Sequence, residues 1–264
     1  MSTQASRFSL AGKVALVTGA ARERGIGRGI AERLAEEGCD VAINDVGAED
    51  QAAELVEHIR GLGRRAVFVR CDVTQPQQVA DMVAAVESQL GPLDIVVSNA
   101  GVADWIDLVD LTPASFDKQV AVNLTGAFNV CRSGAQAMIA GGRGGRIVIT
   151  SSVHVQMPFP SMSVYGATKA GLKGLCETMA IELAPHGITV NHIGPGWVRS
   201  FINDPNPGLQ TDAEVASTLE LIPLGTPADP RDMGDAVVYL TSAAGHYVTG
   251  EFLRVDGGFV VGKH

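Results

Sequence analysis

Tyr165 and Lys169 stand four positions apart in a segment with helical periodicity, and together they could carry out acid/base chemistry. Residues four apart share one face of a helix, so the phenol and the ammonium can point into one pocket. A free tyrosine has a pKa near 10 and is a poor base at neutral pH. An ammonium about 4 Å away would favour the phenolate by roughly 4 kcal/mol at an effective dielectric of 20, enough to lower the phenol pKa towards neutrality. The pair could then take a proton from an alcohol or return one to a carbonyl, although Tyr-x-x-x-Lys also arises by chance on exposed helices.

Three further polar residues are candidates for the same site. Ser152 precedes Tyr165 by 13 positions and follows a predicted strand, while Asn123 stands inside a helical pattern, where a polar amide is otherwise disfavoured. His154, two positions after Ser152, either donates to a substrate hydroxyl or packs the loop that carries it.

A glycine-rich loop joins the first predicted strand to a helix and could bind a pyrophosphate. It contains Gly19, Arg22, Arg24, Gly25, Ile26 and Gly27. Glycines allow a tight turn and let backbone N–H groups approach phosphates at a helix N-terminus. Such a loop is a weak signal alone, and its position after the first strand of a βαβ unit makes it a candidate dinucleotide site.

Asp45 ends the second predicted strand and could select the dinucleotide. A carboxylate at this position accepts hydrogen bonds from the adenosine ribose and repels a 2′-phosphate, which favours NAD over NADP. The next residue is Val46 rather than an arginine that could bind that phosphate. Arg22 and Arg24 could make charge-assisted contacts with the phosphate, so NADP is the alternative to the predicted NAD.

Two short motifs follow the third and fourth predicted strands. Asp72-Val73 could contact the adenine, and Asn99-Ala100-Gly101 could place a small hydrogen-bonding edge against the nucleotide. Either could be ordinary strand-end turn chemistry, so they indicate a nucleotide only in combination with the glycine loop.

Alternating apolar runs and amphipathic segments must position these residues. Strands are predicted at residues 14–17, 41–43, 66–69, 95–97, 147–149, 189–193 and 252–255, and helices at 28–37, 49–62, 77–90, 116–139, 163–184 and 230–242, with a shorter candidate at 212–219. Several strands are apolar on consecutive residues, as expected when both faces are covered. The pattern predicts an α/β, Rossmann-type doubly wound parallel sheet of about seven strands, with residues 1–264 as a single domain.

The composition excludes several classes of function. With 20 basic and 29 acidic residues the formal net charge is −9, which disfavours nucleic acid and anionic membranes as partners. The sequence has no stretch of about 18 apolar residues and no apolar signal-peptide core near Met1, and a cytoplasmic location is expected. Four scattered cysteines (Cys39, Cys71, Cys131 and Cys176) are expected to be buried free thiols rather than disulfides or metal ligands.

Taken together, these motifs resemble the short-chain dehydrogenase/reductase family over essentially the whole chain. The resemblance rests on the glycine loop, Asp72, Asn99-Ala100-Gly101, Asn123, Ser152, Tyr165 with Lys169, Pro195-Gly196 and a closing Val255-Asp256-Gly257-Gly258. It implies that Tyr165 is the acid/base and that Lys169 lowers its pKa and holds the nicotinamide ribose. It also implies that Ser152 binds the substrate oxygen and that Asn123 sustains a water-linked proton relay ending at Lys169.

The nicotinamide end of the site is implied by the same resemblance. The segment Pro195-Gly196-Trp197-Val198-Arg199-Ser200 would hold the carboxamide, with Ser200 where the family commonly has threonine. Hydride would pass directly between the substrate carbon and the ring, with no metal.

Two features differ from the usual family pattern. Five residues separate Gly19 from Gly25 where three are usual, and Ser98 replaces the first asparagine of an Asn-Asn-Ala-Gly motif. The long loop is similar to that of the enoyl reductase branch, but that branch spaces its tyrosine and lysine more widely. We therefore expect no reduction of carbon–carbon double bonds.

The motifs around Ser152 and Pro195, together with Ile202-Asn203, are most similar to bacterial glucose 1-dehydrogenases, which implies a sugar, polyol or related hydroxy compound as the substrate. The alternatives are a 3-oxoacyl thioester (acyl-carrier-protein) reductase and a catalytically inactive nucleotide-sensing protein. Trp197, with Trp105, could wall the substrate pocket or pack in the core.

The resemblance further implies a homotetramer, with the helices at 116–139 and 163–184 pairing across one two-fold interface. The irregular segment 197–223 follows the sixth strand and is expected to cover the site. Phe259, with Val260 and Val261, could pack against another subunit.

Overall fold

Seven parallel strands form one sheet in the computed structural model, which describes residues 6–200 and 212–262. They are β1 (Val14–Thr18), β2 (Asp40–Asp45), β3 (Ala66–Arg70), β4 (Ile95–Ser98), β5 (Gly145–Thr150), β6 (Ile188–Pro195) and β7 (Phe252–Val255). Their order across the sheet is β3-β2-β1-β4-β5-β6-β7, and each pair of neighbours is parallel. The predicted Rossmann-type fold is confirmed, and no predicted strand end is more than two residues from the observed one.

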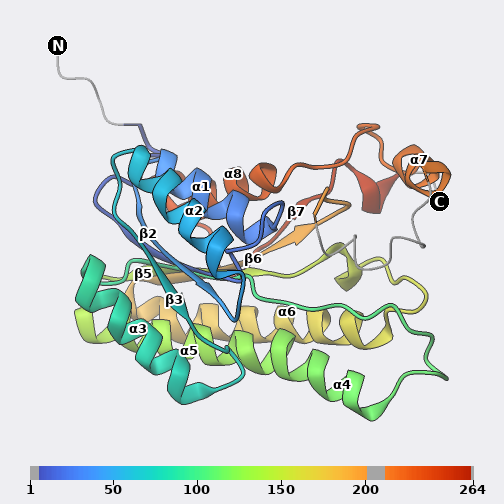
Figure 1. The fold of residues 1–264 in the computed structure, drawn as a ribbon, viewed down its shortest axis with the longest axis horizontal. Coiled ribbons are helices and arrows are strands. Elements are labelled where there is room, and N and C mark those ends of the chain that lie inside the picture. The colour runs from blue at the N-terminus through green and yellow to red at the C-terminus, as the bar shows by residue number, and fades with distance from the viewer. Residues whose placement is uncertain (1–5, 201–211, 263–264) are drawn as a thin grey trace.

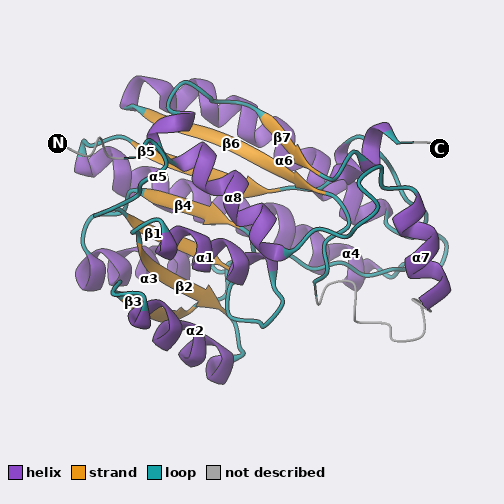
Figure 2. Ribbon diagram, turned by 90° about the horizontal axis from the view of Figure 1, so that it is seen from above, coloured by secondary structure: helices purple, strands orange, loops and turns teal. Residues whose placement is uncertain are grey.

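Helices cover both faces of the sheet (Figures 1 and 2). One layer contains α1 (Ile26–Glu36), α2 (Glu49–Gly61) and α8 (Pro230–Thr241), and the other contains α3 (Pro76–Leu90), α4 (Pro113–Val120), α5 (Ala127–Gly141) and α6 (Ser163–Leu183). The consecutive apolar residues of the strands explain this arrangement, because alternate side chains enter opposite layers. In β5, Ile147 and Ile149 belong to the core on one face, whereas Val148 belongs to the core on the other.

The helix predicted over residues 116–139 is longer and less regular than expected. The helical path begins at Pro113, after the Thr112 side chain accepts a hydrogen bond from the backbone N–H of Ser115, and it ends at Gly141. Between α4 and α5 the hydrogen bonding is π-helical over Ala121–Gly126. A π-helical segment widens the turn, so its side chains take directions that a regular helix would not give them.

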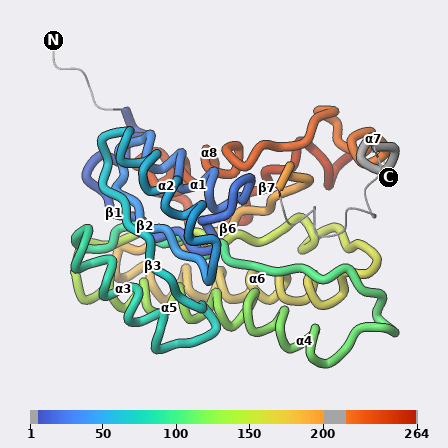
Figure 3. Tube along the Cα trace, in the orientation of Figure 1, coloured from blue at the N-terminus to red at the C-terminus, as the bar shows by residue number. Residues whose placement is uncertain are grey.

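The strand ends determine where a ligand can bind. β1 lies between β2 and β4, and the chain leaves the sheet in opposite directions from this central position. In such sheets the crevice at the carboxyl ends of the strands is the usual ligand site. Helix α7 (Asp212–Glu220) and the C-terminal segment lie together at this side of the molecule (Figure 3). There Phe259 packs with Ile222. Among the described residues, no helix is long and apolar enough to cross a membrane.

Candidate active site

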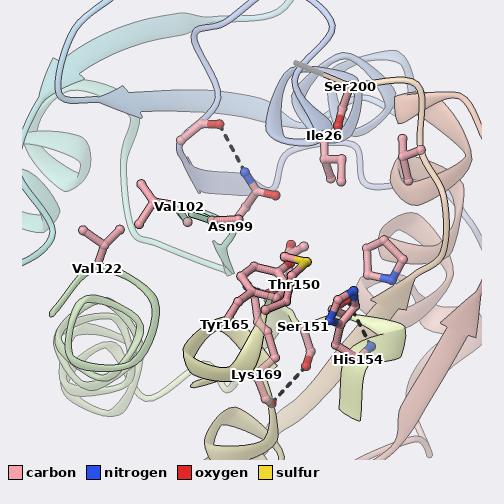
Figure 4. Close-up of a pocket in the computed structure, with 18 of the residues that line it drawn as sticks. Ile26, Asn99, Val102, Val122, Thr150, Ser151, His154, Tyr165, Lys169 and Ser200 are labelled. Atoms are coloured by element: carbon pink, nitrogen blue, oxygen red, sulfur yellow. Dashed lines mark hydrogen bonds between the residues drawn. The ribbon is translucent and has the colours of Figure 1, made fainter. Parts of the chain in front are cut away.

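A cavity of about 990 Å³ opens at the carboxyl ends of the strands. Six strands contribute a residue at or just beyond their ends: Gly19, Asp45, Asp72, Asn99, Ser152 and Pro195. Tyr165 and Lys169 of α6 line the same cavity, as Figure 4 shows. The fold therefore brings the predicted acid/base pair and most of the predicted dinucleotide residues to one site, whereas Arg24, Gly25 and Gly27 of the glycine loop do not line the cavity.

Burial changes the acid/base properties of Tyr165 and Lys169. The Lys169 ammonium donates to the backbone oxygen of Thr150 at 2.8 Å and lies 5.4 Å from the centre of the Tyr165 ring. Burial lowers the pKa of Lys169 to about 8. Burial also raises the pKa of Tyr165 to about 12, and a hydrogen bond with Ser152 acts in the opposite direction. Withdrawal from water disfavours the charged form of both groups and so acts against the predicted lowering of the tyrosine pKa by the lysine, which stays a prediction.

Asn123 lies on the π-helical segment and joins three parts of the chain. Its side-chain oxygen accepts from the backbone N–H of Val102 at 2.8 Å, and its amide nitrogen donates to the Val102 carbonyl at 2.9 Å and to the Thr168 hydroxyl at 3.2 Å. The Thr168 hydroxyl in turn donates to the Tyr165 carbonyl at 2.7 Å. Asn123 thus ties the loop after β4 to the turn of α6 that carries Tyr165 and Lys169. No contact among the described residues tests the proposed proton relay, which stays a prediction.

The lengthened glycine loop contains an additional turn. The N–H of Gly25 donates to the carbonyl of Arg22 at 2.9 Å, Arg24 has a left-handed φ of 57°, and α1 begins at Ile26. Arg22 and Ile26 line the cavity. The two extra residues are therefore accommodated before the helix, so that the helix N-terminus still faces the site.

Close packing holds this loop against the turn after β4. The Asn99 amide donates to the carbonyls of Thr18 and Gly19 at 3.0 and 3.1 Å, and the Thr18 hydroxyl accepts from the backbone N–H groups of Asn99 and Ala100. A methyl group added to Gly19 would lie 2.8 Å from the Cα of Ala100, and one added to Gly27 would lie 2.6 Å from the Asn99 amide nitrogen. The glycines are required here because the two turns touch through their backbones.

Asp45 is buried at the adenosine end, where its orientation is set by the backbone. Its two carboxylate oxygens accept from the N–H of Ala21 at 3.3 Å and of Val46 at 2.8 Å. Asp72 and Val73 line the cavity beside it, and the Asp72 carboxylate also accepts from the N–H of Thr74. Asp45 therefore presents a fixed negative charge at the position predicted to recognise the ribose.

Ser200 carries a polar atom without a protein partner at the nicotinamide end. Its buried hydroxyl oxygen has no hydrogen bond within the described chain. The residue lines the cavity, as Figure 4 shows. Pro195, Gly196 and Val198 line the same cavity. A buried hydroxyl with no partner has a place for a ligand's hydrogen bond. The closing motif, at Val255 and Asp256, packs directly against the backbone of Gly196. The Gly196 N–H donates to the carbonyl of Val255, and a methyl group at Gly196 would lie 2.7 Å from the Cα of Asp256.

These residues fit a nicotinamide dinucleotide. Asp45 is fixed for the ribose, the glycine loop brings backbone N–H groups to the end of α1, and the Ser200 hydroxyl is unpaired where the carboxamide is expected. Among the described residues, no cluster of three or more His, Cys, Asp or Glu side chains could hold a metal ion.

The substrate end contains both predicted residues and others that the sequence did not indicate. His154, Trp105 and Trp197 line it as predicted. The further residues that line it are Asp104, Lys118, Phe159, Met162, Ser217, Thr218 and Phe259. His154 stacks on Phe159 with ring centres 4.6 Å apart and meets the edge of Tyr165 at 5.2 Å. No local pattern indicated Phe159 or Phe259, because only the tertiary fold brings the C-terminal segment to this cavity.

Two expectations about the cover of the site have different outcomes. Ser217 and Thr218 of α7 line the cavity, so part of segment 197–223 does cover it, while residues 201–211, including Ile202 and Asn203, lie outside the described residues. The suggestion that Phe259 packs against another subunit is wrong for its side chain, which is buried against Val153 and Ile222 of its own chain.

Comparison with known proteins identifies the family. A family model described as enoyl-(acyl carrier protein) reductase matches residues 19–260. The chain is 38% identical over 253 residues to L-rhamnose 1-dehydrogenase (NAD(P)(+)) from Sphingomonas sp. (strain SKA58), an alignment covering 96% of this chain and 98% of that protein. It is also 38% identical over 246 residues to the 3-oxoacyl-(acyl-carrier-protein) reductase FabG of Staphylococcus epidermidis (strain ATCC 12228), covering 93% and 98% of the two chains.

A solved structure supports the same assignment. The gluconate 5-dehydrogenase of Burkholderia cenocepacia J2315, in complex with NADP and tartrate, superposes with a TM-score of 0.90 at 33% identity over 97% of this chain and 98% of that one. The chain belongs to the short-chain dehydrogenase/reductase family. It is an NAD(P)-binding oxidoreductase that interconverts hydroxyl and keto groups, so the inactive sensor considered above is set aside.

Proposed function

We propose that this enzyme is an NAD-preferring dehydrogenase of a sugar, a polyol or a related hydroxy compound. The observation that carries the proposal is the single cavity in which Asp45 stands at one end and Ser152, Tyr165 and Lys169 at the other. The similarity to L-rhamnose 1-dehydrogenase and to gluconate 5-dehydrogenase supports a polyhydroxy substrate.

The geometry suggests how the residues divide the reaction. In the oxidative direction, Ser152 and Tyr165 hydrogen-bond the substrate hydroxyl, and Tyr165 takes its proton while the C–H hydrogen leaves as hydride. A nicotinamide held by these residues would supply the hydride acceptor, and its positive ring would favour the phenolate that burial disfavours. Lys169, Asn123 and Thr168 hold the tyrosine's helix turn in place.

The cofactor preference is tested through Asp45. Substitution Asp45→Ala removes the fixed charge at the ribose position, and we expect the ratio of kcat/KM with NADP to that with NAD to rise at least about tenfold. The matched control is Asp50→Asn, which removes an exposed carboxylate from α2 and should leave the ratio unchanged. An unchanged ratio in Asp45→Ala would assign the preference to the loop arginines Arg22 and Arg24.

The substrate class is tested with initial rates on a panel of sugars, polyols, secondary alcohols, 3-oxoacyl thioesters and enoyl thioesters. Turnover of an aldose or a polyol supports the proposal. Turnover of the 3-oxoacyl thioester alone would replace it with the acyl-carrier-protein reductase function named for the Staphylococcus relative. The enoyl thioester checks the prediction, still untested, that the enzyme does not reduce carbon–carbon double bonds.

We also propose that residues 1–264 act as one domain in a cytoplasmic homotetramer. Phe128 of α5 and Ile181 of α6 are 46% and 77% exposed, which is unusual for apolar side chains on long helices and fits a subunit interface. Cys39, Cys71, Cys131 and Cys176 are all buried with free thiols, as suits a reducing compartment. Light scattering after size exclusion gives the oligomeric state, and Ile181→Asp is expected to reduce it.

A further inference from the structure

Aromatic and apolar side chains dominate the substrate end of the cavity. Trp105, Val153, Phe159, Met162, Trp197 and Phe259 supply the apolar lining at this end. His154 adds a polar edge, and burial together with Lys169 lowers its pKa to about 4, so the imidazole is neutral at physiological pH. The surroundings thus offer packing surface and hydrogen bonds but no charge from the histidine.

The cations that line the cavity either interact with other protein groups or lie away from the substrate end. Arg22 belongs to the glycine loop at the opposite end, and the buried Lys169 ammonium is bonded to the Thr150 carbonyl. The third, Lys118, lies 3.2 Å from an oxygen of Asp104, whose other oxygen accepts from the Ser115 hydroxyl at 2.7 Å. Each positive charge near the substrate therefore has a partner.

The chain that follows the sixth strand adds negative charge. Residues 200–230 include Asp204, Asp212, Glu214, Glu220 and Asp229 but no Lys, Arg or His. Arg231, which comes next, is paired with Glu36 on α1 at 2.7 Å, and Arg199 is exposed and does not line the cavity. The described part of this segment therefore supplies no cation to the cavity.

We propose that the site selects uncharged hydroxy or keto substrates and excludes carboxylates and phosphates. This inference rests on the proposed function, which it narrows to neutral sugars and polyols. An anion that enters a largely apolar pocket loses its hydration and needs a cation or several donors in return. Here Lys118 is paired with Asp104, the Lys169 ammonium is bonded to a backbone carbonyl, and Arg22 lies at the cofactor end. A neutral polyol, by contrast, needs only hydrogen bonds and contact with the aromatic faces.

The experiment compares matched pairs of compounds that differ in charge. The pairs are glucose with gluconate, propane-1,2-diol with lactate, and, for reduction, 4-hydroxybutan-2-one with acetoacetate. We expect kcat/KM for the neutral member of each pair that is turned over to exceed that of its anion by at least about thirtyfold. A preference for the anion in any pair overturns the inference. If only the diol or ketone pair reacts, the sugar function fails, but charge selectivity is still measured.

A single substitution tests the role of the ion pair. Asp104→Asn leaves Lys118 without its carboxylate at the rim of the cavity, and we expect the ratio of anion to neutral kcat/KM to rise about three- to tenfold, since this lysine is half-exposed. Asp117→Asn is the matched control, because it removes the same charge from an exposed position of α4 outside the cavity. Equal ratios in the two variants would overturn the assignment of selectivity to the Lys118–Asp104 pair.

Discussion

The buried ammonium of Lys169 should destabilise the fold in a pH-dependent way. Burial lowers its pKa from 10.5 to about 8, which corresponds to about 3 kcal/mol of unfavourable folding free energy when the lysine is charged in both states. This destabilisation is complete below pH 8. It disappears as the pH rises to 10.5, because the folded lysine loses its proton while the unfolded chain keeps its own. The contribution of Lys169 to stability should therefore become more favourable across this window, by about 2 kcal/mol between pH 7 and pH 9.5.

Substitution Lys169→Met isolates this effect. The variant loses the hydrogen bond to the Thr150 carbonyl, 2.8 Å long, at a cost of about 1 kcal/mol at every pH. We expect it to be about 2 kcal/mol more stable than the wild type at pH 7 and within about 1 kcal/mol of it at pH 9.5, while it loses oxidoreductase activity.

Urea unfolding followed by tryptophan fluorescence measures the difference, with equal protein concentrations so that subunit association contributes equally. The control is Lys173→Met, one turn further along α6, where the lysine is exposed and paired with Glu177. Its effect on stability should be the same at both pH values. A wild-type stability that does not change relative to Lys169→Met between pH 7 and pH 9.5 would refute the reasoning.

Three further substitutions test the site. Tyr165→Phe should lower kcat by about 10²- to 10⁴-fold with little change in cofactor affinity, which titration of NADH fluorescence can show; loss of affinity as well would mean that the hydroxyl also holds the cofactor. Ser200→Ala should raise the KM for the cofactor about three- to tenfold, because it removes the unpaired hydroxyl that is expected to bind the cofactor. Ser200→Thr keeps a hydroxyl and should leave this KM close to the wild-type value. Gly27→Ala should weaken cofactor binding and lower stability by about 1–3 kcal/mol in thermal unfolding, since the methyl group would press on Asn99 and Gly19; wild-type behaviour would show that the turn can move.

Local patterns predicted most of the secondary structure. Consecutive apolar residues mark strands that are covered on both faces, and glycines follow several helices: Gly38, Gly63, Gly91 and Gly187 all have positive φ values, which glycine adopts more readily than other residues. The predicted catalytic and cofactor residues that line the cavity could be found for the same reason. Their chemistry depends on short spacings, such as the four positions from Tyr165 to Lys169, or on immediate succession to a strand.

The start of the helix at Pro113 and its π-helical segment could not be found in this way. Asn123 was noticed as a polar residue in a helical pattern, but its three hydrogen bonds involve Val102 and Thr168, which are 21 and 45 positions away. Bonds over such distances depend on how α5 and α6 pack, and hydrophobic periodicity contains no information about them.

The sequence by itself therefore determined the class of fold, the residues with chemistry and the end of the sheet at which they would meet. Only the tertiary structure decided the ionisation of Tyr165 and Lys169, the burial of Phe259 in its own subunit, and the pairing of Lys118 with Asp104. The physical reason is the same in each case. Desolvation and charge pairing depend on which distant segments exclude water from a group, whereas strand and helix periodicity depends on neighbours along the chain.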